Sequence, residues 1–384
     1  MGTISIESAI VYFGALQGVL LSIFFFTRKV GKPTPQVLAG LIFLFSVNLL
    51  LPALVKQFLQ VFPHLLGIGD PMLFLFGPLL FFYASFLTGN VTAFSKRDLL
   101  HLLPFAACVM LLSPIYLLGG DEKVELYQRY FESGIPYKLY LIWIAASLHN
   151  IIYIAAAIKQ IQIYRLRIKN TFSNIDRISL RWFKLILSGS LVIWLIDGYM
   201  LSSVLLDFDL GFLESLGHLL GYVSTIFIYY IGYRTLKEPE TSSQLILAAY
   251  SKEENKKYYR SGLSTSKADE YQSALLTFMQ EDSPYLNPEL TLTDLGQALS
   301  APNNHLSQVL NEKFSQNFFD FINNYRVEEA KQWLSNPAKN QATMLAIAFE
   351  SGFKSKSTFN AAFKKHTGQT PSEFRKSSQV LRTA

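Results

Sequence analysis

Charged residues are scarce in this chain of 384 residues. Lysine, arginine, aspartate and glutamate make up 16% of it, against roughly 25% in soluble domains. Half of the residues are hydrophobic, and phenylalanine and tyrosine are abundant. This composition excludes an ordinary soluble protein along the whole length. It indicates a membrane protein with a soluble part, built from two or three domains.

Cysteine and the common zinc motifs are also scarce. Cys108 is the single cysteine and lies in an apolar run, so an internal disulfide is excluded. The sequence holds neither an HExxH motif nor two histidines four residues apart, which excludes the helical zinc sites built on those motifs. The sequence predicts no metal, no cofactor and no catalytic residue.

Seven apolar stretches precede residue 234, each near the roughly 20 residues that cross a bilayer as a helix. They predict an all-α membrane domain over residues 1–236. We expect the first stretch to be a retained span and not a signal peptide, because no basic segment precedes it. Gly77-Pro78 interrupts the third stretch, which predicts a kinked helix. The stretches lie near Ile6–Thr27, Gln36–Lys56, Pro71–Leu87, Leu99–Leu118, Tyr137–Ile158, Phe183–Leu206 and Phe212–Tyr233.

The loops between these stretches predict their orientation. With the N-terminus outside, the inner flanks hold fourteen lysine and arginine residues and the outer flanks hold four. Basic residues accumulate on the cytoplasmic side of membrane proteins. We therefore expect a multi-pass protein of the inner (cytoplasmic) membrane, embedded in the lipid bilayer, with its N-terminus outside and its C-terminal domain in the cytoplasm.

Several polar side chains fall inside the predicted spans, where ionisable groups are costly unless they face a cavity or a partner. A ligand pocket in the bundle and hydrogen bonding between helices explain them equally well. A metal site is a less favoured third explanation. Glu214 and His218 are four residues apart and therefore share one helix face. The candidate ligand-sensing residues are His149, Asn150, Asp197, Glu214 and His218.

Residues 237–267 are polar and predict a cytoplasmic linker, after which residues 268–384 form a second predicted domain. In that domain Thr291 and Asp294 predict the cap of a short helix. A second helix follows the turn at Pro302. We expect the outward face of this second helix to carry Asn304, His305, Ser307 and Gln308.

The last forty residues contain a second pair of short helices. Met344, Leu345, Ala348 and Phe349 repeat at helical spacing and predict a buried face on the first helix. The segment Ser351-Gly352-Phe353 predicts a tight turn.

Ser355 is placed to cap the second helix of this pair. Phe359 and Phe363, four residues apart, predict the face that anchors it to the first helix, and Gly368 ends it. Two short helices joined by a glycine turn, the second polar and basic outside, are typical of a helix-turn-helix.

The segment IAFESGFKSKSTFNAAFKKHTGQTPSEFR resembles the second helix-turn-helix signature of AraC-type transcription regulators. Residues 285–376 carry the resemblance. The segment HLSQVLNEKFSQNFFDFINNYRVEEAK is similar to the subgroup in which such a domain follows a multi-span membrane domain. The resemblance implies two helix-turn-helix units joined by a long helix, here Gln316–Leu334, which spans roughly 28 Å.

This resemblance implies double-stranded DNA as the partner of the C-terminal domain. Asparagine and glutamine suit adenine edges, and lysine suits guanine, while other lysines contact phosphate. The candidate base-reading residues are Asn304, His305, Ser307, Gln308, Lys356, Ser357, Thr358 and Asn360. The candidate phosphate contacts are Lys313, Lys354, Lys364 and Lys365.

The sequence supports two alternative hypotheses for the function of the protein. The first is a non-enzymatic, membrane-embedded transcription regulator that couples a small-molecule or membrane signal to DNA binding. RNA polymerase and a second copy of the chain are further candidate partners. The second is an intramembrane enzyme or transporter with a regulatory tail. Convergence of His149, Asp197, Glu214 and His218 around one cavity would favour the second function.

Overall fold

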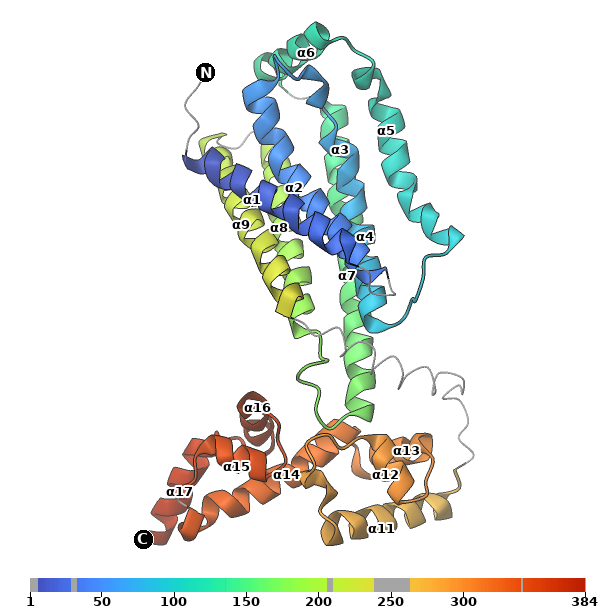
Figure 1. Cartoon of the computed structure of the whole chain (residues 1–384), viewed down its shortest axis with the longest axis vertical. Helices are drawn as coiled ribbons and strands as arrows, with labels where there is room; N and C mark the ends of the chain where they lie inside the picture. The colour runs from blue at the N-terminus through green and yellow to red at the C-terminus, as the bar shows by residue number, and fades with distance from the viewer. Residues whose placement is uncertain are drawn as a thin grey trace. The chain divides into compact units, whose positions relative to one another are not determined.

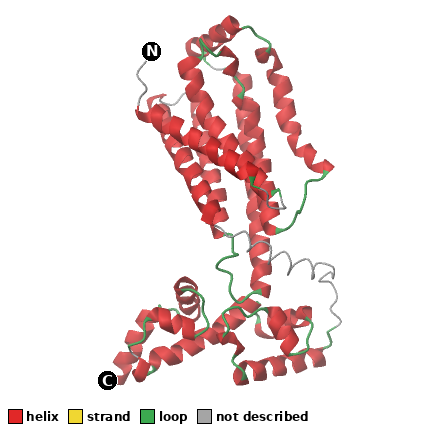
Figure 2. Cartoon of the chain, in the orientation of Figure 1, coloured by secondary structure: helices red, strands yellow, loops and turns green. Residues whose placement is uncertain are grey.

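The computed structural model describes residues 6–28, 33–134, 136–205, 210–237, 263–339 and 341–383. Within these ranges the regular structure is helical (Figure 2), which confirms the all-α fold class. The chain forms two compact units. The first joins Met1–Gln162 to Leu180–Ser243, and the second joins Ile163–Ser179 to Gln244–Ala384. The predicted linker lies largely in residues 238–262, outside the described residues.

The first unit is a bundle of helices (Figure 1). Its helices are α1 (Ile6–Thr27), α2 (Thr34–Phe58), α3 (Gly69–Met72), α4 (Phe76–Thr88), α5 (Leu103–Tyr116), α6 (Gly120–Ser133), α7 (Tyr137–Thr171), α8 (Arg181–Leu205) and α9 (Leu210–Lys237). Short 3-10 turns occur at Pro63–Leu65, Leu73–Leu75 and Lys96–Leu102.

Six helical segments among the described residues are long and apolar enough to cross a membrane. They correspond to the first six predicted spans: Ala9–Thr27, Thr34–Phe58, Pro63–Thr88, Lys96–Tyr116, Tyr137–Thr171 and Arg181–Leu201. The seventh predicted span falls in α9, which is helical. The side chains of residues 210–218 lie outside the described residues, so its role as a span stays a prediction.

Aromatic side chains fill the centre of the first unit. Phe45 on α2 contacts Phe76 on α4 and Phe227 on α9, with ring centroids 4.7 and 5.5 Å apart. Phe76 in turn contacts Trp194 on α8 at 5.9 Å. All three pairs are edge-to-face, the arrangement that aromatic quadrupoles favour. Four helices therefore meet in one aromatic cluster.

The outer surface of this unit is apolar as well. Phe13 and Phe26 on α1 and Met110 and Leu111 on α5 are each at least two-thirds exposed. Water disfavours large exposed apolar side chains in such number, whereas hydrocarbon does not. The exposed faces of α1 and α5 are thus suited to lipid.

The third predicted span is interrupted, as the Gly77-Pro78 pair indicates. The 3-10 turn Leu73–Leu75 separates α3 from α4. Pro78 has no backbone N–H, so the Phe74 carbonyl lacks its usual helical donor. Inside a membrane such a group needs another partner.

Two side chains of α7 supply these partners. Asn150 donates its amide to the Leu73 carbonyl at 2.9 Å and accepts from the Gly77 N–H at 2.6 Å. The His149 Nε2 atom lies 3.2 Å from the Phe74 carbonyl oxygen. Asn150 and His149 thus complete the backbone hydrogen bonding of the neighbouring broken helix.

The second unit contains seven helices among its described residues (Figure 1). They are α11 (Thr265–Glu281), α12 (Leu292–Ala298), α13 (Asn303–Phe314), α14 (Phe318–Ser335), α15 (Met344–Glu350), α16 (Lys356–Thr367) and α17 (Pro371–Thr383). The end of α7 and the loop 172–179 also belong to this unit.

Helix α14 serves two separate cores. Residues in its first half, Phe318–Ile322, pack with α11, α12 and α13. Residues in its second half, Val327–Leu334, pack with α15, α16 and Phe374 of α17. At 1.5 Å per residue this helix is roughly 27 Å long. The long connecting helix predicted at Gln316–Leu334 is present, and it begins two residues later because Asn317 caps it.

Arg326 lies between these two cores and is buried. Its Nε donates to the Tyr285 carbonyl at 2.7 Å, and Nη1 donates to the carbonyl of Ser173 and to Asn323 Oδ1. Its Nη2 donates to Ser173 Oγ and to the Asn287 carbonyl. Burial lowers the pKa of Arg326 to about 9, which leaves the guanidinium charged at neutral pH. One cation thereby joins α14, the segment before α12 and the loop 172–179.

The predicted packing of α15 is partly wrong. Leu345 and Phe349 are 44% and 51% exposed, whereas Ile347 and Ala348 are fully buried. Leu345 and Phe349 are four residues apart and share a face, but that face points away from the core. In a helix of only seven residues, apolar residues on both sides leave the buried face ambiguous from sequence.

Replacing Phe359 by alanine tests the second core. Phe359 is fully buried against Phe353 and Phe363. The Phe359→Ala variant should lose roughly 3–5 kcal/mol of stability, as buried phenylalanines do. Denaturant unfolding of the second unit measures this. The exposed neighbour Asn360, replaced by alanine, should change stability by less than about 0.5 kcal/mol. Equal effects of both variants would show that the helix phase is wrong.

Replacing Asn150 by alanine tests the repair of the broken span. The variant leaves the Gly77 N–H without its acceptor and removes one donor from the Leu73 carbonyl, at roughly 1–3 kcal/mol for the buried N–H. The melting temperature of the full chain in detergent should fall by several degrees. Asn48→Ala is the control, since Asn48 donates to the Leu44 carbonyl of its own helix. No difference between the two variants would contradict the assigned role.

Candidate nucleic-acid interface

The helices α12 and α13 are joined by a four-residue turn. A capping box begins α12: Asp294 N–H donates to Thr291 Oγ1 at 3.2 Å, and Thr291 N–H donates to the Asp294 carboxylate at 2.8 Å. This is the predicted cap. At the start of α13, Pro302 occupies the N-cap position, where it makes no side-chain hydrogen bond. Asn303 instead donates to Thr293 Oγ1, which ties α13 back to α12.

Fewer residues of α13 are exposed to solvent than the sequence predicts. Asn304 is exposed, and Gln308 is half-buried and donates to Glu312 at 2.8 Å. Ser307 is only 4% exposed, so its predicted outward orientation is wrong. It points inward because it shares a face with buried Leu310. The His305 ring packs near Tyr271 of α11, with centroids 6.0 Å apart.

The turn between α15 and α16 requires a glycine at position 352. This residue has φ +82°, a conformation that glycine adopts without strain. A Cβ atom here would lie 2.4 Å from the Tyr285 carbonyl oxygen and 2.9 Å from Leu286 Cα. The absence of a side chain therefore lets the turn contact the backbone before α12.

Helix α16 presents a polar face above an aromatic core. The Thr358 N–H donates to Ser355 Oγ at 3.2 Å, which confirms Ser355 as the cap. Phe359 and Phe363 are buried beneath. The side chains that share exposure to solvent on the other face are Lys356, Ser357, Asn360 and Lys364.

Thr358, a further candidate base-reading residue, is less exposed than these side chains. It is half-buried, and its hydroxyl donates to the Asp176 carboxylate. The other carboxylate oxygen of Asp176 accepts from Ser355 Oγ at 2.5 Å. An acidic residue from the loop 172–179 therefore sits at the first turn of α16.

Three of the four candidate phosphate contacts are engaged in ion pairs. Lys313 Nζ lies 2.5 Å from Asp269, and Lys365 Nζ lies 2.8 Å from Asp320. Burial alone would raise the pKa of Asp320, but the hydrogen bond and charge of Lys365 reverse this and lower it. Each pair has one side chain that is 58% exposed, and ion pairs at the surface contribute about 0–1 kcal/mol, so DNA can compete for the lysines.

The other two candidates differ from each other. Lys354 forms an ion pair with Glu289, a partner outside the α15–α16 pair. Lys364 is exposed on the same face of α16 as Asn360. Of the four lysines, Lys364 is the best placed for a phosphate beside this helix.

The candidate sensing residues that the structure describes form hydrogen bonds to neighbouring helices. His149 and Asn150 bond to the backbone of the broken third span. Asp197 accepts from Ser147 Oγ at 3.3 Å, a contact between α8 and α7. The side chains of Glu214 and His218 lie outside the described residues. These bonds fit the explanation of hydrogen bonding between helices, and a role of these residues in sensing stays a prediction.

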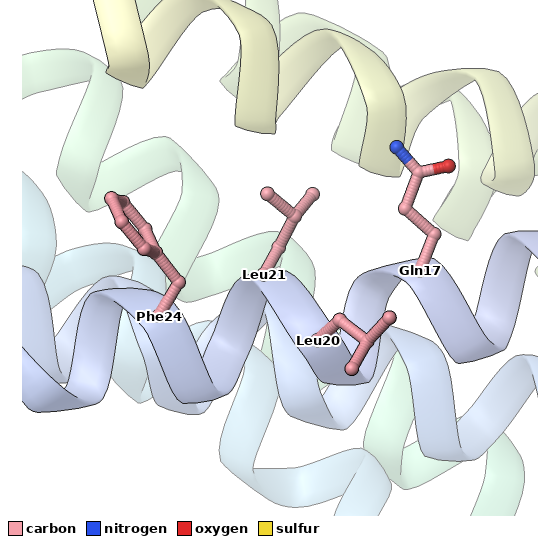
Figure 3. Close-up of a pocket in the computed structure, with 4 residues that line it drawn as sticks. All are labelled: Gln17, Leu20, Leu21 and Phe24. Atoms are coloured by element: carbon pink, nitrogen blue, oxygen red, sulfur yellow. The ribbon is translucent and has the colours of Figure 1, made fainter.

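A pocket in the first unit does not involve these residues. Its lining consists of Gln17, Leu20, Leu21 and Phe24, all on α1 (Figure 3). Three of the four are apolar, and α1 carries much exposed apolar surface. Such a groove suits a lipid chain better than a polar ligand.

Sequence reasoning missed three residues of the second unit: Ser173, Asp176 and Arg326. Arg326 had a detectable signal, because it stands four residues after Ile322 and four before Ala330, on the apolar face of its helix. Ser173 and Asp176 had none, since their partners are more than a hundred residues away in the chain.

In a comparison with known proteins, the model of the family described as helix-turn-helix domain matches residues 295–377. An uncharacterized HTH-type transcriptional regulator of Staphylococcus aureus (strain COL) is 32% identical over 91 residues, 24% of this chain and 12% of the relative. The uncharacterized HTH-type transcriptional regulator YtdP of Bacillus subtilis (strain 168) is 30% identical over 93 residues, with the same two shares. The chain spans about 12% of the length of these curated relatives.

A solved structure of a protein of unknown function from Listeria innocua is 30% identical, covers 27% of this chain and 93% of its own, and has a TM-score of 0.24. The family match and the curated relatives agree with the sequence signature. Over residues 295–377 this chain is therefore similar to helix-turn-helix transcriptional regulators, of the AraC type that its sequence resembles.

Proposed function

We propose that the protein is a membrane-embedded transcription regulator that binds specific DNA sequences through its second unit. The similarity of residues 295–377 to helix-turn-helix regulators supports the DNA-binding part. Six apolar helices in the first unit support the membrane part. The first unit receives a signal, and the second unit converts it into a change of DNA occupancy.

The exposed face of α16 is the observation that carries this proposal. Lys356, Ser357 and Asn360 stand side by side on a helix whose opposite face is fixed by Phe359 and Phe363. A rigid helix with polar side chains at these positions fits the major groove, where bases present their hydrogen-bonding edges. Asn304 on α13 is the corresponding exposed candidate in the first pair.

We further propose that α12–α13 and α15–α16 are two helix-turn-helix units. Helix α14 connects them and is roughly 27 Å long, while successive major-groove faces on one side of DNA lie about 34 Å apart. The two units come from one chain and are not identical, so no two-fold axis relates them. A single chain therefore reads two different elements in direct orientation.

The second candidate, an intramembrane enzyme or transporter, has less support. It rests on convergence of His149, Asp197, Glu214 and His218. His149 is occupied with the Phe74 carbonyl, and Asp197 with Ser147. These bonds favour a structural role for the described pair, and sensing by Glu214 and His218 on α9 remains part of the regulator proposal.

Selection on random duplex DNA with the full chain in detergent tests the two-unit proposal. The selected motif should hold two elements about one helical turn apart. Asn304→Ala and Asn360→Ala should each weaken binding by roughly 1–3 kcal/mol and relax preference in a different element. Lys364→Ala should weaken all sequences alike and reduce the salt dependence by about one phosphate contact. Unchanged motifs in both asparagine variants would refute two-headed reading.

Reporter fusions test the proposed topology of seven spans with the N-terminus outside. A reporter enzyme active only in the cytoplasm should work when fused after Lys169 and fail when fused after Gly120. The basis is the accumulation of lysine and arginine on one side of the spans. A reporter active only outside the cytoplasm should give the opposite pattern, and cytoplasmic activity after Gly120 would overturn the assigned orientation.

A further inference from the structure

The loop between α7 and α8 docks onto the rest of the second unit through buried contacts. Ser173 is fully buried, and both its carbonyl and its hydroxyl accept from Arg326 at 3.0 Å. The Ser173 N–H donates to the Leu290 carbonyl at 3.2 Å. Ile175 is buried as well. The loop is therefore an integral part of the proposed DNA-binding unit.

Asp176 extends from this anchored loop to the proposed reading helix. Its two carboxylate oxygens accept from Ser355 Oγ and Thr358 Oγ1, at the cap and in the first turn of α16. Ser355 Oγ also lies 3.0 Å from Ser357 Oγ. A negative charge thus occupies the amino-terminal end of α16, where the helix dipole favours anions.

A DNA phosphate is the other anion that this end of a reading helix would bind. Helix N-termini and serine or threonine hydroxyls are common phosphate ligands in protein–DNA complexes. The hydroxyls of Ser355 and Thr358 cannot serve a phosphate while Asp176 holds them. The carboxylate would also repel a phosphate brought close to it, because both are negatively charged.

We propose that the docked α7–α8 loop competes with DNA for the amino-terminal end of α16, with Asp176 in the position of a DNA phosphate. This inference rests on the proposed function. Asp176 is five residues after the end of α7 and five before the start of α8. Both helices contain candidate membrane spans. A change in these two helices therefore reaches α16 through a very short segment, and withdrawal of Asp176 frees the helix for DNA.

Asp176→Asn in the full chain tests the competition. The variant keeps one hydrogen-bond acceptor for the hydroxyls of Ser355 and Thr358 but removes the charge. With a duplex recovered by selection on random DNA, its affinity should rise about tenfold over wild type. The salt dependence should steepen by about one phosphate contact. Glu350→Gln, which removes an exposed charge at the end of α15, is the matched control and should change affinity less than about twofold.

Hydrogen exchange of the wild-type chain gives an independent measurement. Saturation with the same duplex should speed exchange at residues 175–178, because DNA displaces Asp176 from α16, whereas the Ser173 N–H should keep its protection because Ser173 stays bonded to Arg326. Unchanged protection of residues 175–178 in the bound complex would overturn the proposal, as would an Asp176→Asn affinity within about twofold of wild type. If neither the wild-type protein nor the Asp176→Asn variant enriches any sequence from random DNA, the proposed function itself fails. Equal enrichment and equal affinity of the two proteins would leave that function intact and reject the competition alone.

Discussion

The buried guanidinium of Arg326 is the interaction on which the second unit depends. A buried cation is stable only when its donors are satisfied, and the five hydrogen bonds of Arg326 end on three separate segments of the chain. These segments must therefore be in place together. The two cores along α14 meet at this residue, so their relative position depends on the same set of bonds.

In the first unit, too, buried polar groups need hydrogen-bond partners, and here the partners are uncharged. Pro78 removes a backbone donor beside an irregular turn that water cannot reach in a membrane, and Asn150 bonds to two backbone groups next to that turn. From sequence alone, a polar residue in an apolar span is a candidate ligand-binding residue. The structure shows that the same residue can be required by an irregular helix next to it.

Local sequence signals predicted much of this fold. The caps at Thr291 and Ser355 and the break beside Pro78 follow from neighbouring residues, and the structure contains all three. The inward orientation of Ser307 and the exposure of Leu345 depend on where distant helices lie. Sequence periodicity in helices this short cannot determine that, and neither can it reveal a loop that docks from a remote part of the chain.

Helix α14 also limits how the proposed DNA site can diversify. Each residue inserted into a helix advances the following segment by about 1.5 Å and rotates it by about 100°. An insertion within Phe318–Ser335 would turn one helix pair away from the DNA face used by the other, and would also displace Arg326 from its partners. In the proposed mode of binding, the spacing between the two DNA elements is therefore fixed by the length of α14, whereas the bases within each element can change through single side chains on α13 and α16.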